Sequence, residues 1–284
     1  MARVISVATE VPAYKVTQQE ARDYVHQMYG ELFPDIDQYL TIFDNPAIEE
    51  RYFCKPTEWF VNEHSVAERN AAYVEEACQL GEQAIRSCLH EAGISPREVD
   101  SIFFVSTTGL STPSIDAHLI NRLGMNSHIR RTPIWGLGCA GGVAGLARAV
   151  EATRAFPKSY VLLVAVELCS LTFCKNDLSK SNFVATSLFS DGAAAVLLAG
   201  DEVPLKGIEK SMPRIIATMS TLWPHSQDVM GWDVVEEGLK VIFSKEIPAI
   251  ISMELMPALT HFLKENKMDL EQIQHFILHP GGMK

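Results

Sequence analysis

Continuous apolar runs alternate with helical patterns along the first two thirds of the chain, and this alternation constrains the fold more than any other feature. Three runs have the length and composition of strands buried on both faces of a sheet: 99–108, 159–167 and 193–200. Helices are predicted over 66–91, 114–123 and 140–156, and shorter strands over 2–9 and 132–135. Strands separated by helices of about 10–15 residues imply βαβ units, so we expect a layered α/β domain with a largely parallel sheet.

Charge and hydropathy exclude several classes of protein. The 284 residues carry 24 Lys and Arg against 35 Asp and Glu, a net charge of −11, which argues against a nucleic-acid binder. The first residues lack the pattern of a signal peptide, and the apolar run 160–166 is far shorter than the ~20 residues of a bilayer span. Six cysteines without a CxxC pair favour neither a disulfide framework nor a zinc module. We expect a cytoplasmic protein without membrane or nucleic-acid partners.

A weak internal repeat suggests that the α/β unit is duplicated. The segment ISPREVDSIFF (94–104) is echoed by MDLEQIQHFIL (268–278), at an offset of 174 residues. Each copy has a polar turn after a helix, then Glu or Gln before Val or Ile, then a predicted buried strand. We therefore expect an N-terminal half over 1–203 and a C-terminal half over 204–284. Because the repeat in the second half begins only at residue 268, we expect the second half to be truncated relative to the first.

The segment TPIWGLGCAGGVAGLARA (132–149) contains a formal GxGxxG between a predicted strand and a predicted helix. This dinucleotide-binding fingerprint requires an acidic residue ~20 positions further on. The first acid at a strand end is Glu167, which follows Gly136 by 31 positions. Nicotinamide binding is therefore only a minor interpretation.

A second interpretation of this segment centres on Cys139. Gly138, Gly141 and Gly142 allow a sharp turn from strand to helix and leave space for a substrate. A thiol at a helix N-terminus lies at the positive end of the helix dipole, which favours the nucleophilic thiolate. The alternative is an inert buried thiol beside glycines that pack a helix onto a sheet.

His279 offers a partner for such a nucleophile. It ends the predicted strand of HFILHPGG (275–282), and Pro280 with two glycines forces a turn directly afterwards. Functional side chains of α/β proteins often lie at such strand ends. A structural histidine that caps the strand is the alternative. Cysteine and histidine at comparable turns of two related halves favour a shared site.

Four motifs together resemble type III polyketide synthases, the chalcone synthase-like branch of the thiolase fold. They are WGLGCAGG (135–142), ELCSLTF (167–173), SLFSDGAAA (187–195) and HPGG (279–282), in the order and spacing of that family. The resemblance spans essentially the whole chain. It implies a homodimer of thiolase-like subunits, each with duplicated βαβαβ halves in a layered α/β/α arrangement.

The resemblance also implies roles for individual residues. Cys139 would carry the acyl group, His279 would support it, and Phe189 would be the gatekeeper between a CoA tunnel and the reaction cavity. The acyl starter would come from an acyl-CoA, and malonyl-CoA would be decarboxylated to extend it, with no metal or bound cofactor. Further substrate-binding wall positions would be Thr107, Thr112, Cys169, Thr172 and Ser190. Ser190, like Ala185, stands where the family pattern has glycine, and both would reshape the cavity.

The chain also departs from the family pattern. The asparagine that completes the family's triad lies beyond HPGG, so we expect a catalytically incomplete chain. The usual basic residues before Arg51 are absent, which leaves Arg51, Lys55 and Lys284 as candidates for the CoA phosphates. Small side chains at Thr112 and Cys169 favour aliphatic starters and alkylpyrone products. Ketoacyl synthase III, hydroxymethylglutaryl-CoA synthase and a non-catalytic partner of a full-length relative are the alternatives.

Overall fold

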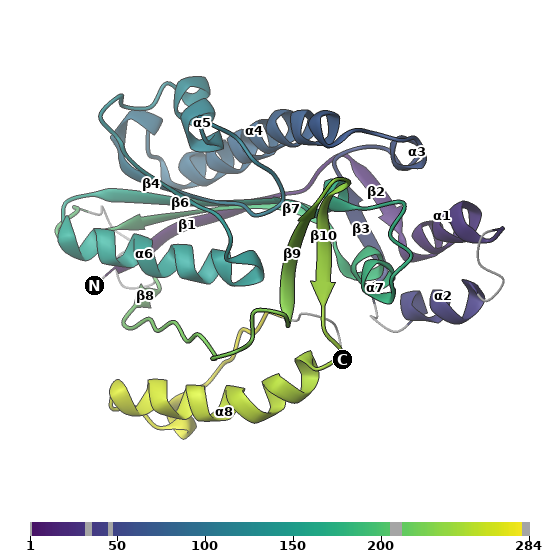
Figure 1. Ribbon diagram of the computed structural model, residues 1–284. Coiled ribbons are helices and arrows are strands. Elements are labelled where there is room, and N and C mark those ends of the chain that lie inside the picture. Colours follow the sequence, from purple (N-terminus) through teal and green to yellow (C-terminus); the bar gives the residue numbers. More distant parts are fainter. Residues whose placement is uncertain (1, 32–35, 45–47, 205–211, 280–284) are drawn as a thin grey trace. The chain divides into compact units, whose positions relative to one another are not determined.

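The computed structural model describes residues 2–31, 36–44, 48–204 and 212–279 (Figure 1). The chain packs into two compact units, and each is described by itself. Unit 1 comprises residues 1–17, 50–172 and 189–216, and unit 2 comprises residues 18–49, 173–188 and 217–284. These units interleave along the chain, and the expected boundary between halves at residues 203 and 204 stays a prediction.

Unit 1 is built on a six-stranded sheet in the order β5-β4-β6-β7-β1-β8. The strands are β1 (Ala2–Glu10), β4 (Val99–Val105), β5 (Arg130–Ile134), β6 (Tyr160–Leu168), β7 (Asp191–Ala199) and β8 (Arg214–Ile215). Strand β4 is parallel to β5 and β6, whereas β7 is antiparallel to β6 and β1, and β1 is antiparallel to β8. The sheet is therefore mixed, and the expectation of a largely parallel sheet is wrong.

The difference in strand direction follows from the connections. Strands β4, β5 and β6 are joined by helices α5 (Ile115–Leu123) and α6 (Gly141–Ala155), which carry the chain back to the same starting edge. Between β6 and β7 the chain passes through residues 173–188 of unit 2 instead. It then re-enters the sheet at the edge where β6 ended, so β7 runs in the opposite direction.

Helices cover both faces of the unit 1 sheet (Figure 1). Ile102 and Phe104 of β4 pack in one cluster with α4 (Val66–Ala92) and α5. The alternate residues Phe103 and Val105 pack with α6 in a second cluster on the other face. This period of two is that of a strand with both faces buried, and it confirms the layered α/β/α arrangement.

Helix α4 has clear signals at both ends, which is why its range was predictable. Ser65 caps the first turn in a capping box with Glu68, so two backbone N–H groups that lack helical partners are satisfied. Gly93 ends the helix in the left-handed conformation with φ of 66°. A glycine adopts this conformation without the steric cost that a side chain would add.

The 174-residue echo is present in the local geometry. Gly93 and Lys267 both have left-handed φ values, 66° and 55°, directly after helix α4 and helix α8 (Ile247–Glu265). A capping box then follows at each site, Ser95 with Glu98 and Asp269 with Gln272. The same turn is thus built twice from different residues. This repetition supports a duplicated architecture.

The predicted strand after the second turn is absent from the described residues. Phe276, Ile277 and Leu278 are in irregular structure, and their exposed fractions are 52%, 99% and 66%. A strand forms only where a neighbour accepts and donates its backbone hydrogen bonds. The described part of unit 2 offers this segment no such neighbour, so the apolar run alone does not make a buried strand.

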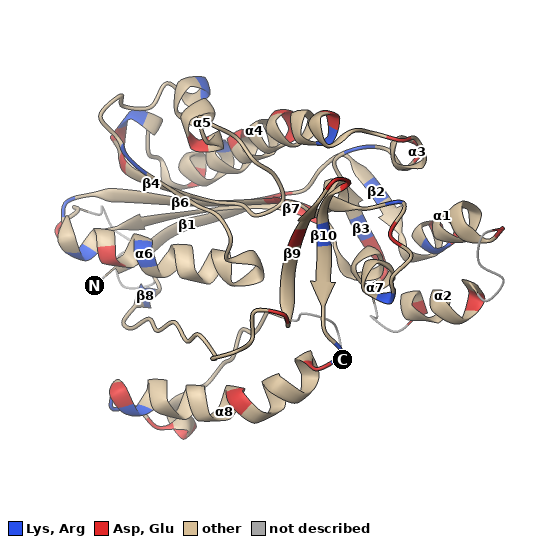
Figure 2. Ribbon diagram, in the orientation of Figure 1, with Lys and Arg blue, Asp and Glu red and all other residues tan. Residues whose placement is uncertain are grey.

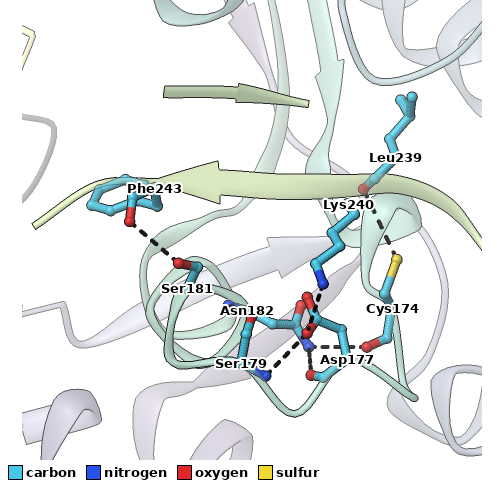
Figure 3. A network of polar contacts seen from close by, with 8 residues as sticks. All are labelled: Cys174, Asp177, Ser179, Ser181, Asn182, Leu239, Lys240 and Phe243. Atoms are coloured by element: carbon cyan, nitrogen blue, oxygen red, sulfur yellow. Dashed lines mark hydrogen bonds and ion pairs between the residues drawn. The ribbon is translucent and has the colours of Figure 1, made fainter. Parts of the chain in front are cut away.

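Unit 2 contains helices α1 (Gln18–Tyr29), α2 (Ile36–Asp44), α7 (Lys180–Leu188) and α8, with the hairpin β9 (Met230–Val235) and β10 (Gly238–Phe243). Polar contacts join residues 174–182 to β10 (Figure 3). Lys240 Nζ lies 3.5 Å from Asp177 Oδ1, and Ser181 donates to the Phe243 carbonyl. Asn182 meanwhile holds the loop closed through the carbonyl oxygens of Cys174 and Asp177. Within the described ranges, no helix is long and apolar enough to cross a membrane.

Candidate active site

Candidate functional side chains gather at one edge of the unit 1 sheet. Strands β4, β5 and β6 are parallel, so their carboxyl ends meet at this edge, and β7 begins there. Charged residues of β6 and β7 are confined to the same edge: Glu167 precedes the last residue of β6, and Asp191 opens β7. In Figure 2 the rest of these two strands is tan, the colour of residues other than Lys, Arg, Asp and Glu. Cys139 follows the carboxyl end of β5 at this edge.

Cys139 lies in the turn that the sequence predicts. Strand β5 is followed by a single 3₁₀ turn, Gly138–Ala140, and α6 begins at Gly141. Gly136 and Gly138 have φ values of 87° and 52°, a conformation that side chains rarely adopt. Of the six cysteines, Cys139 is the exposed one. Cys139 is therefore not a buried residue, and its role as a nucleophile stays a prediction.

The glycines after Cys139 serve packing as well as the turn. A Cβ atom on Gly141 would lie 2.6 Å from Val105 Cγ1, and one on Gly145 would lie 2.7 Å from Leu163 Cδ1. A Cβ atom on Gly142 would meet no atom within 4 Å. Gly141 and Gly145 thus let α6 approach the sheet closely, while Gly142 leaves open space in the turn that follows Cys139.

Glu167 lies near Cys139 and is held by the two threonines that follow β4 and Ser106. Its carboxylate accepts hydrogen bonds from the backbone N–H and the hydroxyl of Thr107, both at 3.0 Å, and from the Thr108 hydroxyl at 2.8 Å. Burial raises the pKa of Glu167, and these hydrogen bonds oppose the rise. The sequence interpretation considered Glu167 only as a nucleotide-binding acid. An acid near the end of a buried strand was the available signal for a role beside the cysteine.

The expected low pKa of Cys139 is not found in unit 1. Although the residue is exposed overall, its thiol is partly desolvated, and this raises the pKa above the ordinary 9.0. The negative charge of Glu167 raises the pKa further. A carboxylate beside a thiol disfavours the thiolate, so the helix N-terminus alone does not activate Cys139.

The predicted wall residues divide into two groups. Thr107 and Thr172 are buried, and Thr172 donates a hydrogen bond to the carbonyl of the half-buried Cys169. Charges on Glu167, Asp191 and Cys139 all act on the Cys169 thiol, so Cys169 lies close to Cys139. Thr112 is exposed in the loop before α5. Among the described contacts, no hydrogen bond joins Thr112 to this group.

Phe189 and Ser190 precede β7 and are held against β3 (Glu50–Phe53). Ser190 Oγ accepts a hydrogen bond from the backbone N–H of Tyr52 and donates one to its carbonyl, at 2.9 and 3.1 Å. The buried Arg51 donates to the Phe189 carbonyl. The Ser190 hydroxyl is thus engaged with the backbone of β3.

His279 is the last described residue of unit 2 and is exposed. Cys139 belongs to unit 1, and the two units are described separately, so the pairing of these residues stays a prediction.

The residues proposed for CoA phosphates are mostly engaged elsewhere. Lys55 forms an ion pair with Glu76 at 2.7 Å. Arg51 is buried, donates a hydrogen bond to the Phe189 carbonyl and lies near the charge of Asp191. Lys284 lies outside the described residues. Sites for the phosphates are therefore not evident from these three residues.

The acid considered for a nucleotide ribose is engaged in other contacts at this edge. Both carboxylate oxygens of Glu167 are occupied by threonine donors rather than open to a ribose. In the part of the chain that the structure describes, no three His, Cys, Asp or Glu side chains are grouped to hold a metal ion.

Comparison with known proteins gives a consistent result. The family model of the chalcone and stilbene synthases, N-terminal domain, matches residues 1–202. The "Putative chalcone synthase" of Bacillus subtilis is 44% identical and is matched over 100% of this chain and 80% of its own length. The 1,3,6,8-tetrahydroxynaphthalene synthase of Streptomyces peucetius is 32% identical, with 99% and 74% covered.

Solved structures agree with the sequence comparisons. The crystal structure of 1,3,6,8-tetrahydroxynaphthalene synthase from Streptomyces coelicolor, described as a bacterial type III polyketide synthase, superposes with a TM-score of 0.91. Its sequence is 29% identical, and the match covers 99% of this chain and 78% of that chain. The likeness therefore extends over both compact units.

Proposed function

Because the chain belongs to the type III polyketide synthases, the chalcone and stilbene synthase family of condensing acyltransferases, we propose that it condenses malonyl-CoA with an acyl group carried on Cys139. The observation that carries this proposal is the position of Cys139. It is the exposed thiol of the chain, in a glycine turn at the carboxyl edge of the sheet and at the N-terminus of a 15-residue helix. A nucleophile at that place is accessible to a thioester and lies beside the positive end of the helix dipole.

In the proposed reaction, the Cys139 thiolate attacks the carbonyl carbon of an acyl-CoA thioester. The oxygen becomes an oxyanion, to which His279 as an imidazole donor gives a hydrogen bond, and the tetrahedral intermediate collapses with loss of the CoA thiolate. Malonyl-CoA then loses carbon dioxide to give an enolate. The enolate attacks the acyl carbonyl, which forms the new carbon–carbon bond and frees Cys139 Sγ.

The raised pKa of Cys139 supports a role for a basic partner. Desolvation and Glu167 both disfavour the thiolate, so attack near neutral pH needs a group that accepts the thiol proton or pairs with the thiolate. An imidazole has the appropriate pKa for this task. His279, in the HPGG motif, is the residue that we propose for it.

For the starter we propose an aliphatic acyl-CoA, with alkylpyrones as products. Cys169 is a small side chain that lies near Cys139, and each CH₂ of an alkyl chain buried beside it contributes ~0.8 kcal/mol. Thr112 is part of the same proposal, although it is exposed in the loop before α5. We further propose that the protein acts as a cytoplasmic homodimer and needs no metal or bound cofactor.

One experiment tests the proposal directly. The purified chain is incubated with hexanoyl-CoA, dodecanoyl-CoA and coumaroyl-CoA in turn, and its intact mass is recorded. We expect an adduct of one acyl group that is absent from Cys139→Ala and retained in Cys78→Ala, whose thiol is buried in α4. Labelled malonyl-CoA is then added to follow carbon dioxide release and product formation.

The outcomes separate the alternatives. In a further incubation with acetyl-CoA, acylation by that thioester alone, without extension beyond one condensation, would favour a ketoacyl synthase III or hydroxymethylglutaryl-CoA synthase. Absence of any adduct on Cys139 would contradict the proposal and favour a non-catalytic binding partner. Faster acylation from coumaroyl-CoA than from either aliphatic thioester would refute the proposed starter class alone.

A further inference from the structure

Residues 189–191, where the chain enters β7, form hydrogen bonds with Arg51 and Tyr52 of β3 and with Cys54 directly after it. In the middle of this segment, the Ser190 hydroxyl forms hydrogen bonds with both the N–H and the C=O of Tyr52. On its other side β3 pairs with β2 (Tyr14–Thr17), where Tyr52 lies opposite Lys15. The hydroxyl therefore satisfies backbone groups of Tyr52 on the side that faces away from β2.

The residue before Ser190 is held by a charged group. Arg51 Nη1 donates to the Phe189 carbonyl at 3.2 Å, and the guanidinium carbon lies 5.4 Å from the ring centroid of Phe53. Burial lowers the pKa of Arg51 to about 10, and Asp191 opposes this change. Arg51 is thus a buried cation at neutral pH, and its contact fixes the backbone of Phe189.

The next residue, Asp191, connects β3 to the segment beside Cys139. Asp191 accepts hydrogen bonds from the Cys54 N–H at 2.8 Å and from the Ser170 N–H at 2.7 Å. Ser170 follows Cys169, on which the charges of Asp191 and Cys139 act. Residues 189–191, which we call the clamp, therefore connect β3 to the wall beside Cys139.

We infer that Ser190 is a positioning residue that sets, through Phe189, the length of acyl chain that the site accepts. This inference rests on the proposed function, taken with the place beside the acyl cavity that the family resemblance implies for Phe189. A glycine at position 190 would leave Tyr52 without the hydroxyl, and the backbone of Phe189 would then be held from one side only. The serine hydroxyl thus ties the residue next to Phe189 to β3.

The test compares four variants by their kcat/KM for hexanoyl-CoA and dodecanoyl-CoA. Ser190→Ala removes the hydroxyl, Ser190→Gly also removes the Cβ, and Ser190→Thr retains the hydroxyl. Ser87→Ala is the matched control, because Ser87 donates an exposed hydroxyl to Glu10 in the same unit. We expect the dodecanoyl-to-hexanoyl ratio to rise about 3- to 10-fold in the Ala and Gly variants, the effect of one or two hydrogen bonds. The Thr and control variants should keep the wild-type ratio.

Hydrogen exchange provides a readout that does not need activity. The Tyr52 amide should exchange faster in Ser190→Ala than in wild type, and at the wild-type rate in Ser190→Thr. An equal loss of kcat/KM for both thioesters in Ser190→Ala would overturn the inference, since a general loss of structure lowers both alike. Unchanged Tyr52 exchange in Ser190→Ala would also overturn it.

Failure of the proposed function has a different signature. If wild-type Cys139 takes up no acyl group, the proposed function is refuted, together with the chain-length control that rests on it. The exchange data then still decide whether Ser190 holds β3.

Discussion

Glu167 accepts hydrogen bonds from both the backbone amide and the hydroxyl of Thr107. This pairing joins the carboxyl ends of β6 and β4 and holds a carboxylate near Cys139. The carboxylate stabilises the edge of the sheet and at the same time disfavours the Cys139 thiolate. Glu167 therefore stabilises this part of the fold at the cost of a less reactive Cys139 thiol.

Replacing Glu167 by Gln should lower the pKa of Cys139. The charge that raises this pKa is removed, while a side-chain oxygen stays available to the threonine donors. The rate of iodoacetamide alkylation at Cys139, measured from pH 7 to 10, should reach its half-maximal value at a lower pH. Glu202→Gln, an exposed change at a distant turn, is the control. An unchanged or raised midpoint in Glu167→Gln would contradict the prediction.

Cys139 should be the first of the six thiols to react with limiting iodoacetamide. The reason is accessibility, because Cys54, Cys78, Cys88 and Cys174 are buried and Cys169 is half-buried. Peptide mapping by mass spectrometry after brief exposure measures the order. Labelling of Cys169 before Cys139 would show that accessibility does not control the reaction.

Gly145→Ala should destabilise the protein, whereas Gly142→Ala should not. The added Cβ on Gly145 would lie 2.7 Å from Leu163 Cδ1 and 2.8 Å from Val105 Cγ2, and displacing these side chains costs about 1–3 kcal/mol. At Gly142 the Cβ meets open space, and alanine is favoured over glycine in a helix by about 0.5–1 kcal/mol. Urea denaturation of both variants gives the comparison. Equal midpoints would refute the packing argument.

Lys267→Gly should stabilise the protein by about 0.5–1 kcal/mol, because Lys267 has a left-handed φ of 55° that favours glycine. The converse change is Gly93→Ala in the equivalent turn, where φ is 66° and no atom lies within 4 Å of the added Cβ. It should destabilise by a similar amount, from backbone strain alone. Opposite shifts in the urea midpoint are expected, and shifts of the same sign would contradict the repeated turn.

Much of the fold could be predicted where local signals are strong. The capping box at Ser65 and the glycine at 93 defined α4, and the apolar runs over β4, β6 and β7 were recognised by their length. The turn at Cys139 was predicted because its glycines lie between a strand pattern and a helix pattern. Each of these features is specified by residues close together in the chain.

Features that depend on distant residues were not predictable in the same way. The direction of β7 is set by the path of residues 173–188 through unit 2 and not by its own composition. Residues 276–278 are apolar, yet strand formation needs a neighbour that the run itself does not specify. The pKa of Cys139 depends on Glu167, which lies 28 positions away in the sequence.

The position of β1 has a consequence for how the chain is made. Arg3 lies opposite Ala199 in the register of β1 and β7, a separation of 196 positions. At synthesis rates of about 5–20 residues per second, β1 leaves the ribosome roughly 10–40 s before its partner β7 exists. During that interval the nascent chain carries an apolar strand with open edges, the kind of surface that chaperones bind and that aggregates form on. Translation speed between codons 10 and 191 should therefore influence the soluble yield.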